Sequence, residues 1–273
     1  MPEKILQKLE GVPQTLLMTL LVRARESQRP DGAIRDEKAV EMMGRIDVDF
    51  SKLIMQRHDE VAVLLRMRKF DKHVRAFLAR HPDGVVVHIG CGLDTRYDRI
   101  GDTSVEWFDL DVPDVMDLRK RLLFTESSRY HTIAASVFET GWLAELTPFD
   151  SRSFLFMAEG VFPYFKEAQI KALFLRLRDR FPGAELVCDA HTPFVIWADN
   201  IHLALSGVKA RLQWKLKNPH DVETWGEGIR LIEAWDYTAD DDPLMQSFRL
   251  VRMIPGLARL SGIYHYRLGT REK

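Results

Sequence analysis

The chain has 273 residues, and 46% of them are hydrophobic, which is enough to bury a sizeable core. We therefore expect one globular unit over residues 1–273. The 39 basic and 40 acidic residues leave a formal net charge of −1, so composition favours neither nucleic acid nor an anionic membrane as a partner. No apolar run reaches the roughly 18 to 20 residues of a membrane span. These features predict a cytoplasmic protein with a small-molecule partner, and they do not indicate an oligomeric state.

The first 80 residues carry the periodicity of amphipathic helices. One apolar face consists of Leu16, Leu17, Leu20 and Leu21, and a second consists of Val61, Leu64, Leu65, Phe70, Val74 and Phe77. Residues 29–32 (RPDG) separate the two faces with turn chemistry, because proline presets φ and glycine accepts a positive φ. We predict a helical cap over residues 1–80 in which this turn separates two helices.

An alternation of strands and helices begins after the cap. The uninterrupted apolar run from Val85 to Ile89 predicts a strand buried on both faces. Further strands are predicted at 105–110, 132–135, 154–158 and 186–188, each followed by a helical or capping pattern. This rhythm predicts a doubly wound α/β fold with a mainly parallel sheet. Two late strands, near 229–235 and 263–268, complete the sheet at one side, and residues 191–226 form an insertion or lid.

A glycine turn comes directly after the first buried strand. Gly90 and Gly92 flank Cys91, and two glycines at this point allow a sharp turn and a close approach of a ligand to the backbone. The next strand ends in acids at Asp109 and Asp111, where a carboxylate can accept hydrogen bonds from both ribose hydroxyls. We take Asp111 as the stronger candidate, and the pair of features predicts a site for a nucleoside-containing cofactor.

A nicotinamide dehydrogenase uses the same two features, so the residues of the glycine turn have to distinguish a nicotinamide cofactor from SAM. The dinucleotide fingerprint requires a third glycine so that the following helix meets a pyrophosphate, and here that position is Thr95. The acidic Asp94 would repel a pyrophosphate but suits a ligand with a sulfonium and an ammonium group. The loop therefore favours S-adenosylmethionine (SAM) over a nicotinamide cofactor.

Three ordered segments resemble one family. Residues 87–96 (VHIGCGLDTR) resemble the LGxGLDTR signature of leucine carboxyl methyltransferases and their bacterial O-methyltransferase relatives. Residues 109–113 (DLDVP) resemble the family's acid-containing strand end, and 158–165 (AEGVFPYF) resemble its EGvlxYL segment. The N-terminal stretch with Arg23 and Asp36 is similar to the polyketide-type branch. The resemblance covers most of the chain and implies a class I SAM methyltransferase fold with a seven-stranded sheet.

The resemblance also implies a set of cofactor-binding residues. Arg66 occupies the position that binds the SAM carboxylate, and Gly90 and Gly92 occupy positions beside the methionine portion. Asp111 takes the position that binds the ribose. Glu159 is expected near the sulfonium or amino group, and its place between an apolar strand and a glycine also favours a functional role.

Ser136 and Val137 occupy the positions that line the adenine edge. The family usually has an acid followed by leucine at these positions, so this chain departs from the family at the adenine contact.

His191 follows the fifth predicted strand at the edge where open parallel sheets bind ligands, so it is a candidate general base. The histidines and cysteines show no metal-ligand spacing, and we expect no bound metal. The predicted reaction is methyl transfer from SAM to an oxygen, in a carboxylate or hydroxyl, of a small-molecule or polyketide-like acceptor. The alternatives are a nicotinamide-dependent oxidoreductase and a catalytically inactive SAM-binding protein.

Overall fold

A computed structural model describes residues 14–50, 53, 55, 57–101, 104–123, 125, 127–205, 210–237 and 260–270. Seven strands form one sheet: β1 (Val85–Ile89), β2 (Glu106–Asp111), β3 (Tyr130–Ala134), β4 (Phe154–Ala158), β5 (Ala184–His191), β6 (Arg230–Asp236) and β7 (Ser261–Leu268). Among the described residues, no helix is long and apolar enough to cross a membrane.

The strand order is β3-β2-β1-β4-β5-β7-β6. Strands β1 to β5 pair in parallel, whereas β7 runs antiparallel to both of its neighbours, β5 and β6. The predicted doubly wound, mainly parallel, seven-stranded sheet is therefore confirmed. The order reverses between β1 and β4, and the carboxyl ends of these two strands flank the position where open α/β sheets bind ligands.

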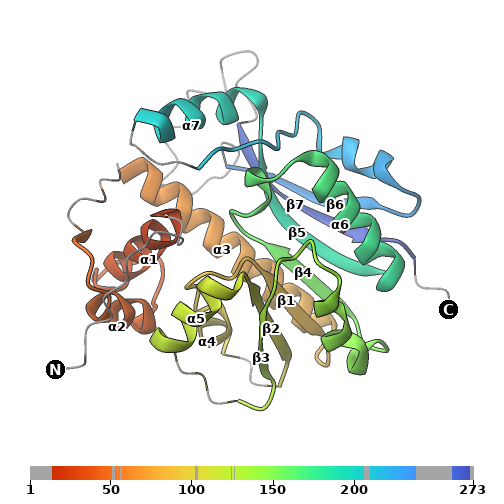
Figure 1. Cartoon of the computed structure of the whole chain (residues 1–273), viewed down its shortest axis with the longest axis horizontal. Helices are drawn as coiled ribbons and strands as arrows, with labels where there is room; N and C mark the ends of the chain where they lie inside the picture. Colours follow the sequence, from red (N-terminus) through yellow and green to blue (C-terminus); the bar gives the residue numbers. More distant parts are fainter. Residues whose placement is uncertain are drawn as a thin grey trace.

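The helices are α1 (Gln14–Ser27), α2 (Glu37–Arg45), α3 (Arg57–Arg80), α4 (Arg96–Ile100), α5 (Pro113–Leu122), α6 (Glu167–Arg180) and α7 (Pro193–Leu205). In the part of the chain that the structure describes, they are accompanied by the 3₁₀ helices η2 (Gly141–Phe149), η3 (Phe162–Tyr164) and η4 (Pro219–Trp225). Figure 1 shows α3 and α6 on opposite sides of the sheet.

The two faces of the sheet have separate cores because successive side chains of a strand point to opposite faces. Val86 of β1 packs in one core with Phe70 and Phe77 of α3. Val87 of the same strand packs in the other core with Phe174 of α6. Both faces are thus covered, which explains why the five residues of β1 are all buried.

The N-terminal helices differ from the prediction at one point. The turn at residues 29–32 separates α1 from α2, not from α3, and the sequence pattern missed α2. This helix has only nine residues, too few to show a long period, but Asp36 caps it by accepting the Ala39 N–H at 3.0 Å. Ala39 and Met42 are buried in a third core, together with residues of α1 and Leu118 of α5.

Two strands are longer than the apolar runs that predicted them. Strand β5 spans Ala184–His191, well beyond the predicted 186–188, because its pairing with β7 continues along its full length. Strand β7 spans Ser261–Leu268, two residues longer than the predicted 263–268, and most of it is buried. Its position between β5 and β6 accounts for this burial: His265 contacts His73 of α3 on one face, and Tyr266 contacts Phe174 of α6 on the other.

Candidate active site

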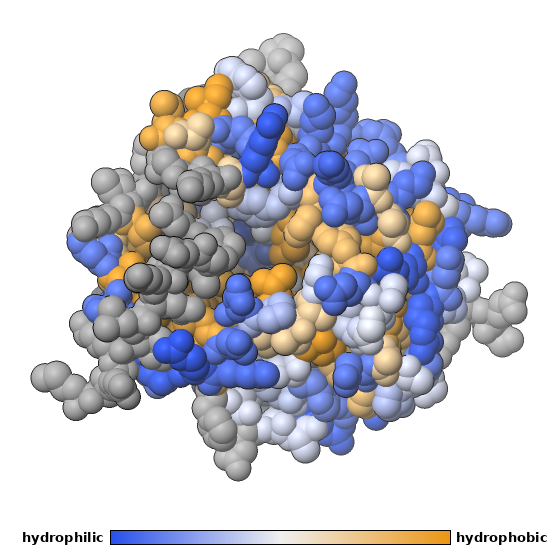
Figure 2. Space-filling model, viewed as in Figure 1, coloured by the Kyte–Doolittle hydropathy of each residue, from blue (hydrophilic) through white to orange (hydrophobic). Residues whose placement is uncertain are grey.

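The predicted site residues come together at the carboxyl ends of neighbouring strands. Gly90 and Gly92 follow β1, Asp111 ends β2, Glu159 directly follows β4, and His191 ends β5. In Figure 2 this face of the molecule is hollowed near its centre, with hydrophilic residues at depth and hydrophobic residues beside them. The sheet topology therefore gathers residues from distant parts of the sequence into one crevice.

The glycine turn has a backbone conformation that favours glycine. Gly90 has a φ of 65° and Gly92 a φ of 51°. A Cβ added to Gly90 would lie 2.3 Å from Cγ2 of Val161, so the turn approaches the segment after β4 too closely for a side chain. At Gly92 the nearest neighbour of such a Cβ is Leu16 of α1, at 3.2 Å. Packing against protein is therefore a reason for glycine at both positions.

Asp111 holds this turn in place. Its carboxylate accepts the Gly92 N–H at 2.8 Å and the Val112 N–H at 2.8 Å. Burial raises the pKa of Asp111 above its usual value, although these two hydrogen bonds oppose the shift. From the other side, Arg119 donates to the Gly92 carbonyl at 3.0 Å. The turn is thus fixed through both its N–H and its carbonyl group.

Asp109, two residues before Asp111 on β2, has a different environment. It is buried in an ion pair with Arg119, and it accepts hydrogen bonds from Tyr130 at 2.6 Å and from the Trp107 indole at 2.8 Å. These contacts are all within the protein. Asp109 thus has a structural role, whereas Asp111 lies at the crevice.

Arg66 reaches from α3 to the ends of β4 and β5. Its Nε donates to Oε1 of Glu159 at 3.0 Å, and its Nη1 donates to Oδ2 of Asp189 at 3.2 Å. Burial alone would lower the pKa of Arg66, but the Asp189 and Glu159 carboxylates outweigh it and raise that pKa. Oδ1 of Asp189 also accepts the Gly160 N–H at 2.7 Å. One guanidinium thus connects two strand ends beside the crevice.

Arg96 has no role predicted from the sequence, and its side chain is fully buried behind Glu159. Its three nitrogens lie 2.6 Å from Oδ1 of Asp71, 3.0 Å from Oδ2 of Asp94 and 2.6 Å from Oε2 of Glu159. Glu159 is therefore held between two arginines, Arg66 and Arg96. A local sequence motif cannot reveal the contacts of Arg96 with Asp71 and Glu159, because these two residues come from elements distant from Arg96 in the sequence.

Asp94 does not cap the helix that follows it, since the N-cap of α4 is Thr95. It pairs instead with Arg99 at 2.6 Å and with Arg96. Burial would raise the pKa of Asp94, but these two arginines outweigh it and hold that pKa well below its usual value. Asp94 is thus an ionised member of a buried network.

Several buried ion pairs join into one continuous network that runs from α1 to the end of β5. It connects four arginines with five carboxylates, namely Arg23, Asp36, Arg99, Asp71, Asp94, Arg96, Glu159, Arg66 and Asp189. The formal charge of this set is therefore one unit negative. A network with that excess suits a ligand with a net positive charge.

Ser136 and Val137 lie just beyond β3, at the same edge as Asp111. The Ser136 hydroxyl lies 3.4 Å from the Phe138 N–H, and the carbonyl of the buried Val137 accepts the Trp142 indole N–H at 3.2 Å. The Ala135 N–H donates to the Asp111 carbonyl at 2.9 Å and joins this turn to β2.

His191 lies at the end of β5 and pairs with a neighbouring strand. Its Nδ1 lies 2.7 Å from the Ser261 hydroxyl of β7. Burial lowers the pKa of His191 below its usual value, although Asp189 and Asp199 oppose the shift. A neutral imidazole at this edge is able to accept a proton near neutral pH.

The segment after β5 attaches to this edge through its main chain. The Gln213 and Trp214 N–H groups both donate to the Pro163 carbonyl, at 2.7 and 3.1 Å, and the Leu216 N–H donates to the His191 carbonyl at 2.9 Å. Pro163 belongs to η3, shortly after Glu159. The segment is therefore anchored beside both strand ends.

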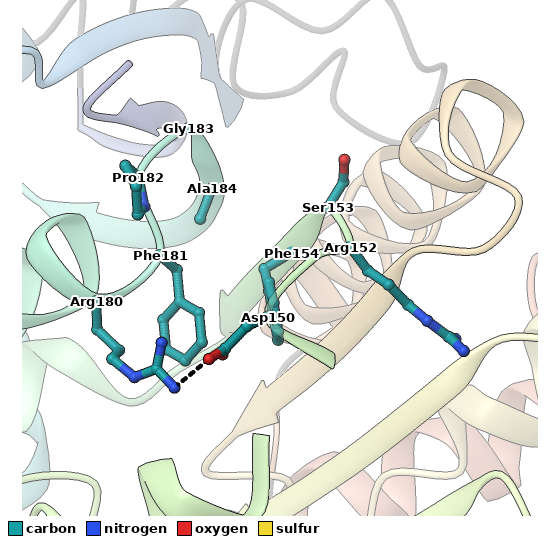
Figure 3. A pocket seen from close by; sticks show the side chains of 9 residues that line it. All are labelled: Asp150, Arg152, Ser153, Phe154, Arg180, Phe181, Pro182, Gly183 and Ala184. Atoms are coloured by element: carbon teal, nitrogen blue, oxygen red, sulfur yellow. Dashed lines mark hydrogen bonds and ion pairs between the residues drawn. The ribbon is translucent and has the colours of Figure 1, made fainter. Parts of the chain in front are cut away.

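A separate pocket of about 290 Å³ lies at the opposite edge of the sheet (Figure 3). It is lined by residues before β4 and β5, and the Arg180 side chain beside it pairs with Asp150 at 2.6 Å. The candidate site residues lie at the carboxyl ends of these strands. This pocket is therefore not part of the candidate active site.

Comparison with known proteins identifies the family. The model of the leucine carboxyl methyltransferase family matches residues 16–178, a span that contains most of α1, the glycine turn and Glu159. This chain belongs to the leucine carboxyl methyltransferase family. It is accordingly an enzyme, a methyltransferase whose methyl donor is SAM, and the nicotinamide alternative does not hold.

Two relatives extend the match over most of the chain. The tetracenomycin polyketide synthesis O-methyltransferase TcmP of Streptomyces glaucescens is 37% identical over 245 residues, which cover 89% of each chain. The S-adenosyl-L-methionine-dependent methyltransferase dpfgK of Gibberella zeae is 26% identical over 245 residues, which cover 82% of each.

Solved structures share the fold at low identity. A DUF574 family protein from Streptomyces avermitilis is 13% identical, with a TM-score of 0.58 over 91% of this chain and 96% of that one. Magnesium protoporphyrin IX methyltransferase from Synechocystis, solved with bound S-adenosylhomocysteine (SAH), is 10% identical, with a TM-score of 0.50 over 85% and 93%. These likenesses support the class I methyltransferase fold.

Proposed function

We propose that the protein transfers a methyl group from SAM to an oxygen atom of a small, polyketide-like acceptor. The observation that carries this proposal is the 37% identity to a polyketide O-methyltransferase, which extends over 89% of both chains and includes the crevice. We further propose that residues 1–273 form one catalytic unit with a helical cap at 1–80.

The residues of the crevice fit SAM. We assign the Asp111 carboxylate to the ribose hydroxyls and the Arg66 guanidinium to the amino-acid carboxylate, with Glu159 beside the amino or sulfonium group. SAM has two positive groups and one carboxylate, so the net negative charge of the buried network matches its net positive charge. This match supports the assignment.

Two shorter segments complete the proposed cofactor site. Gly90 and Gly92 keep side chains away from the methionine portion, and Ser136 and Val137 face the adenine edge. In place of the family's usual acid, the Ser136 hydroxyl offers a neutral acceptor to the adenine amino group.

SAM supplies a methyl group on a positively charged sulfur, which is a strong electrophile. The protein residues then have to hold the acceptor oxygen in line with that group and exclude water. We assign the neutral His191 to the removal of a proton from an acceptor hydroxyl. A carboxylate acceptor would already be ionised at neutral pH and would need no base.

We propose that residues 191–226 act as a lid over the acceptor. Helix α7 in this segment carries exposed apolar side chains, namely Phe194, Trp197, Ile201 and Leu205, and Trp197 is 62% exposed. The main-chain bonds to Pro163 and His191 hold the segment at the same edge as the crevice. Exposed apolar and aromatic side chains suit a flat aromatic acceptor.

The test measures binding first and methyl transfer second. Calorimetry should show one SAM or SAH per chain. A panel of aromatic acids, the matching phenols and the matching anilines, with SAM labelled in the methyl group, then identifies the accepting atom. Mild base releases the label from a methyl ester but not from an aryl methyl ether or amine. Label on the anilines alone would overturn oxygen transfer, and binding without transfer to any acid or phenol would favour an inactive binding protein.

A further inference from the structure

Two histidines and a glutamate meet far from the crevice, where α3 packs against β6 and β7. His73 of α3, Glu233 of β6 and His265 of β7 each offer one ligand atom, and these atoms all lie within 4.8 Å of one another. The two imidazole rings are 5.1 Å apart between centroids, with an interplanar angle of 77°. Three elements that are distant in the sequence thus direct metal-binding side chains to one point.

One atom of this cluster is buried without a partner. Nε2 of His73 has no hydrogen-bond partner in the described part of the chain, and the residue is 7% exposed. A buried polar atom of this kind needs an explanation, because nearly all such atoms in proteins are paired. A cation bound at this point would provide the missing partner.

The ligand set indicates which cation. Two imidazole nitrogens and one carboxylate oxygen are ligands of Zn²⁺, whereas Mg²⁺ and Ca²⁺ prefer oxygen ligands alone. His73 and His265 are buried, but Glu233 is exposed, so water can reach a fourth position. We propose that His73, Glu233 and His265 form a Zn²⁺ site that ties α3 to strands β6 and β7.

Of the charged neighbours of the cluster, Glu185 favours cation binding and Lys69 opposes it. Glu185 of β5 lies 2.8 Å from Nε2 of His265 and also pairs with Arg80 at 2.7 Å. A carboxylate bonded to one nitrogen of an imidazole orients the ring toward a metal on its other nitrogen. Lys69, one helical turn before His73, forms an ion pair with Glu233 and thereby competes with a cation for that carboxylate.

The local spacing of histidines in the sequence shows no such site. His73 and His265 are separated by 192 positions in the sequence, and only the packing of α3 on β7 brings them together. The cluster also lies apart from the proposed methyl transfer, since Arg66 is two turns before His73 on α3 and contacts the ends of β4 and β5 instead. The ion would thus serve stability and not the chemical step.

The test uses the full-length protein, stripped with a chelator and titrated with ZnCl₂ in a calorimeter. We expect one Zn²⁺ per chain and a higher melting temperature with Zn²⁺ present. Loss of one ligand in His73→Gln or His265→Gln should weaken binding by at least about 100-fold, and Glu185→Gln by about 10- to 100-fold. The matched control is His220→Gln, an exposed histidine paired with Glu223, which should leave the affinity unchanged.

Two further variants keep the proposal falsifiable if the buried histidine variants fail to fold. Glu233→Gln changes an exposed side chain and should weaken Zn²⁺ binding, whereas Lys69→Met should strengthen it by freeing Glu233 from its ion pair. Co²⁺ in place of Zn²⁺ should give the visible absorption of a four-coordinate site. The proposal is overturned if wild type binds no stoichiometric Zn²⁺, if both Glu233→Gln and Lys69→Met bind as wild type does, or if His220→Gln is the variant that loses binding.

Discussion

Arg96 donates a hydrogen bond to Glu159 across 2.6 Å, and it does so from a position with no exposure to solvent. The other oxygen of Glu159 accepts from Arg66, so the carboxylate at the end of β4 is fixed from two sides. The family signature contributes Arg96, and the helix before the sheet contributes Arg66. The geometry of the crevice therefore depends on a side chain that lies behind it.

Arg96→Met should destabilise the protein by about 3 to 5 kcal/mol, because it removes the buried arginine that Asp71, Asp94 and Glu159 share and leaves each carboxylate with a single arginine partner. Urea unfolding measures the change. Arg180→Met is the matched control, since its pair with Asp150 is part-exposed and should be worth only about 0 to 1 kcal/mol. Equal effects of the two substitutions would show that the buried network contributes little.

Arg66→Ala should weaken the binding of SAM and SAH by about tenfold to a hundredfold, as expected for the loss of a charge-assisted hydrogen bond to a carboxylate. Arg66→Lys should lose less, because lysine keeps the charge but not the paired donors. Calorimetry with adenosine is the control, since adenosine lacks the amino-acid carboxylate. If the affinities for adenosine and SAH fall equally, Arg66 acts on the fold through Glu159 and Asp189 and does not hold the cofactor.

Asp111→Ala should weaken the binding of SAM by about 2 to 3 kcal/mol, because it removes a charged acceptor of hydrogen bonds. The pKa of Asp111 is raised by burial, so its carboxylate takes up a proton at a higher pH than an ordinary aspartate. The folded protein consequently gains stability from this group as the pH falls, while SAM loses its ionised acceptor. Wild-type affinity should decline on acidification before pH reaches the ordinary aspartate pKa, near 3.8.

Asp111→Asn separates these two effects. It should bind SAM weakly, with little dependence on pH across the same window, because asparagine does not titrate. Calorimetric titrations over a series of pH values measure both proteins. A decline of the same size in Asp111→Asn would assign the pH dependence to another group.

His191→Asn should lower kcat by roughly 10²- to 10⁴-fold with a hydroxyl acceptor while leaving the Kd for SAM unchanged. The pKa of His191 lies below its usual value, so wild-type activity should persist below pH 6.5 and fall only where the imidazole becomes protonated. Steady-state rates across pH measure this. An unchanged kcat with a hydroxyl acceptor would remove His191 from the mechanism.

Methyl transfer should survive exhaustive chelation, because no metal takes part in the proposed chemistry. NAD and NADP at millimolar concentration should leave the melting temperature unchanged, whereas SAM should raise it. Thermal unfolding with each ligand provides the comparison. A shift from NAD as large as that from SAM would contradict the assignment of the glycine turn to SAM.

The sequence predicted the sheet well because each strand has a local signal. The five buried residues of β1 form an apolar run, and Gly90 after β1 and Glu159 after β4 show where those two runs end. Arg66, Asp111 and Glu159 could be named for the same reason, since they lie in motifs or at strand ends. Their contacts with the cofactor stay predictions.

The rest depended on tertiary contacts that no local pattern contains. Asp189 was not among the predicted site residues, yet its fully buried carboxylate accepts hydrogen bonds from Arg66 and the Gly160 N–H. Helix α2 was missed because nine residues are too few to display a helical period. The pairing of Asp71 with Arg96 joins the middle of α3 to the first residue of α4, and only the folded chain places them together.

The segment after β5 is fastened at Pro163 and His191 by bonds between main-chain groups. Main-chain N–H and carbonyl groups are present whatever side chains the segment carries, apart from the missing donor of proline. In the proposed lid, substitutions along residues 210–217 can therefore change the side chains offered to the acceptor without releasing the segment. The buried network that includes Glu159 depends on particular side chains and tolerates no such exchange. Under the proposed assignments, the side chains offered to the acceptor can therefore change while the residues assigned to SAM stay in place.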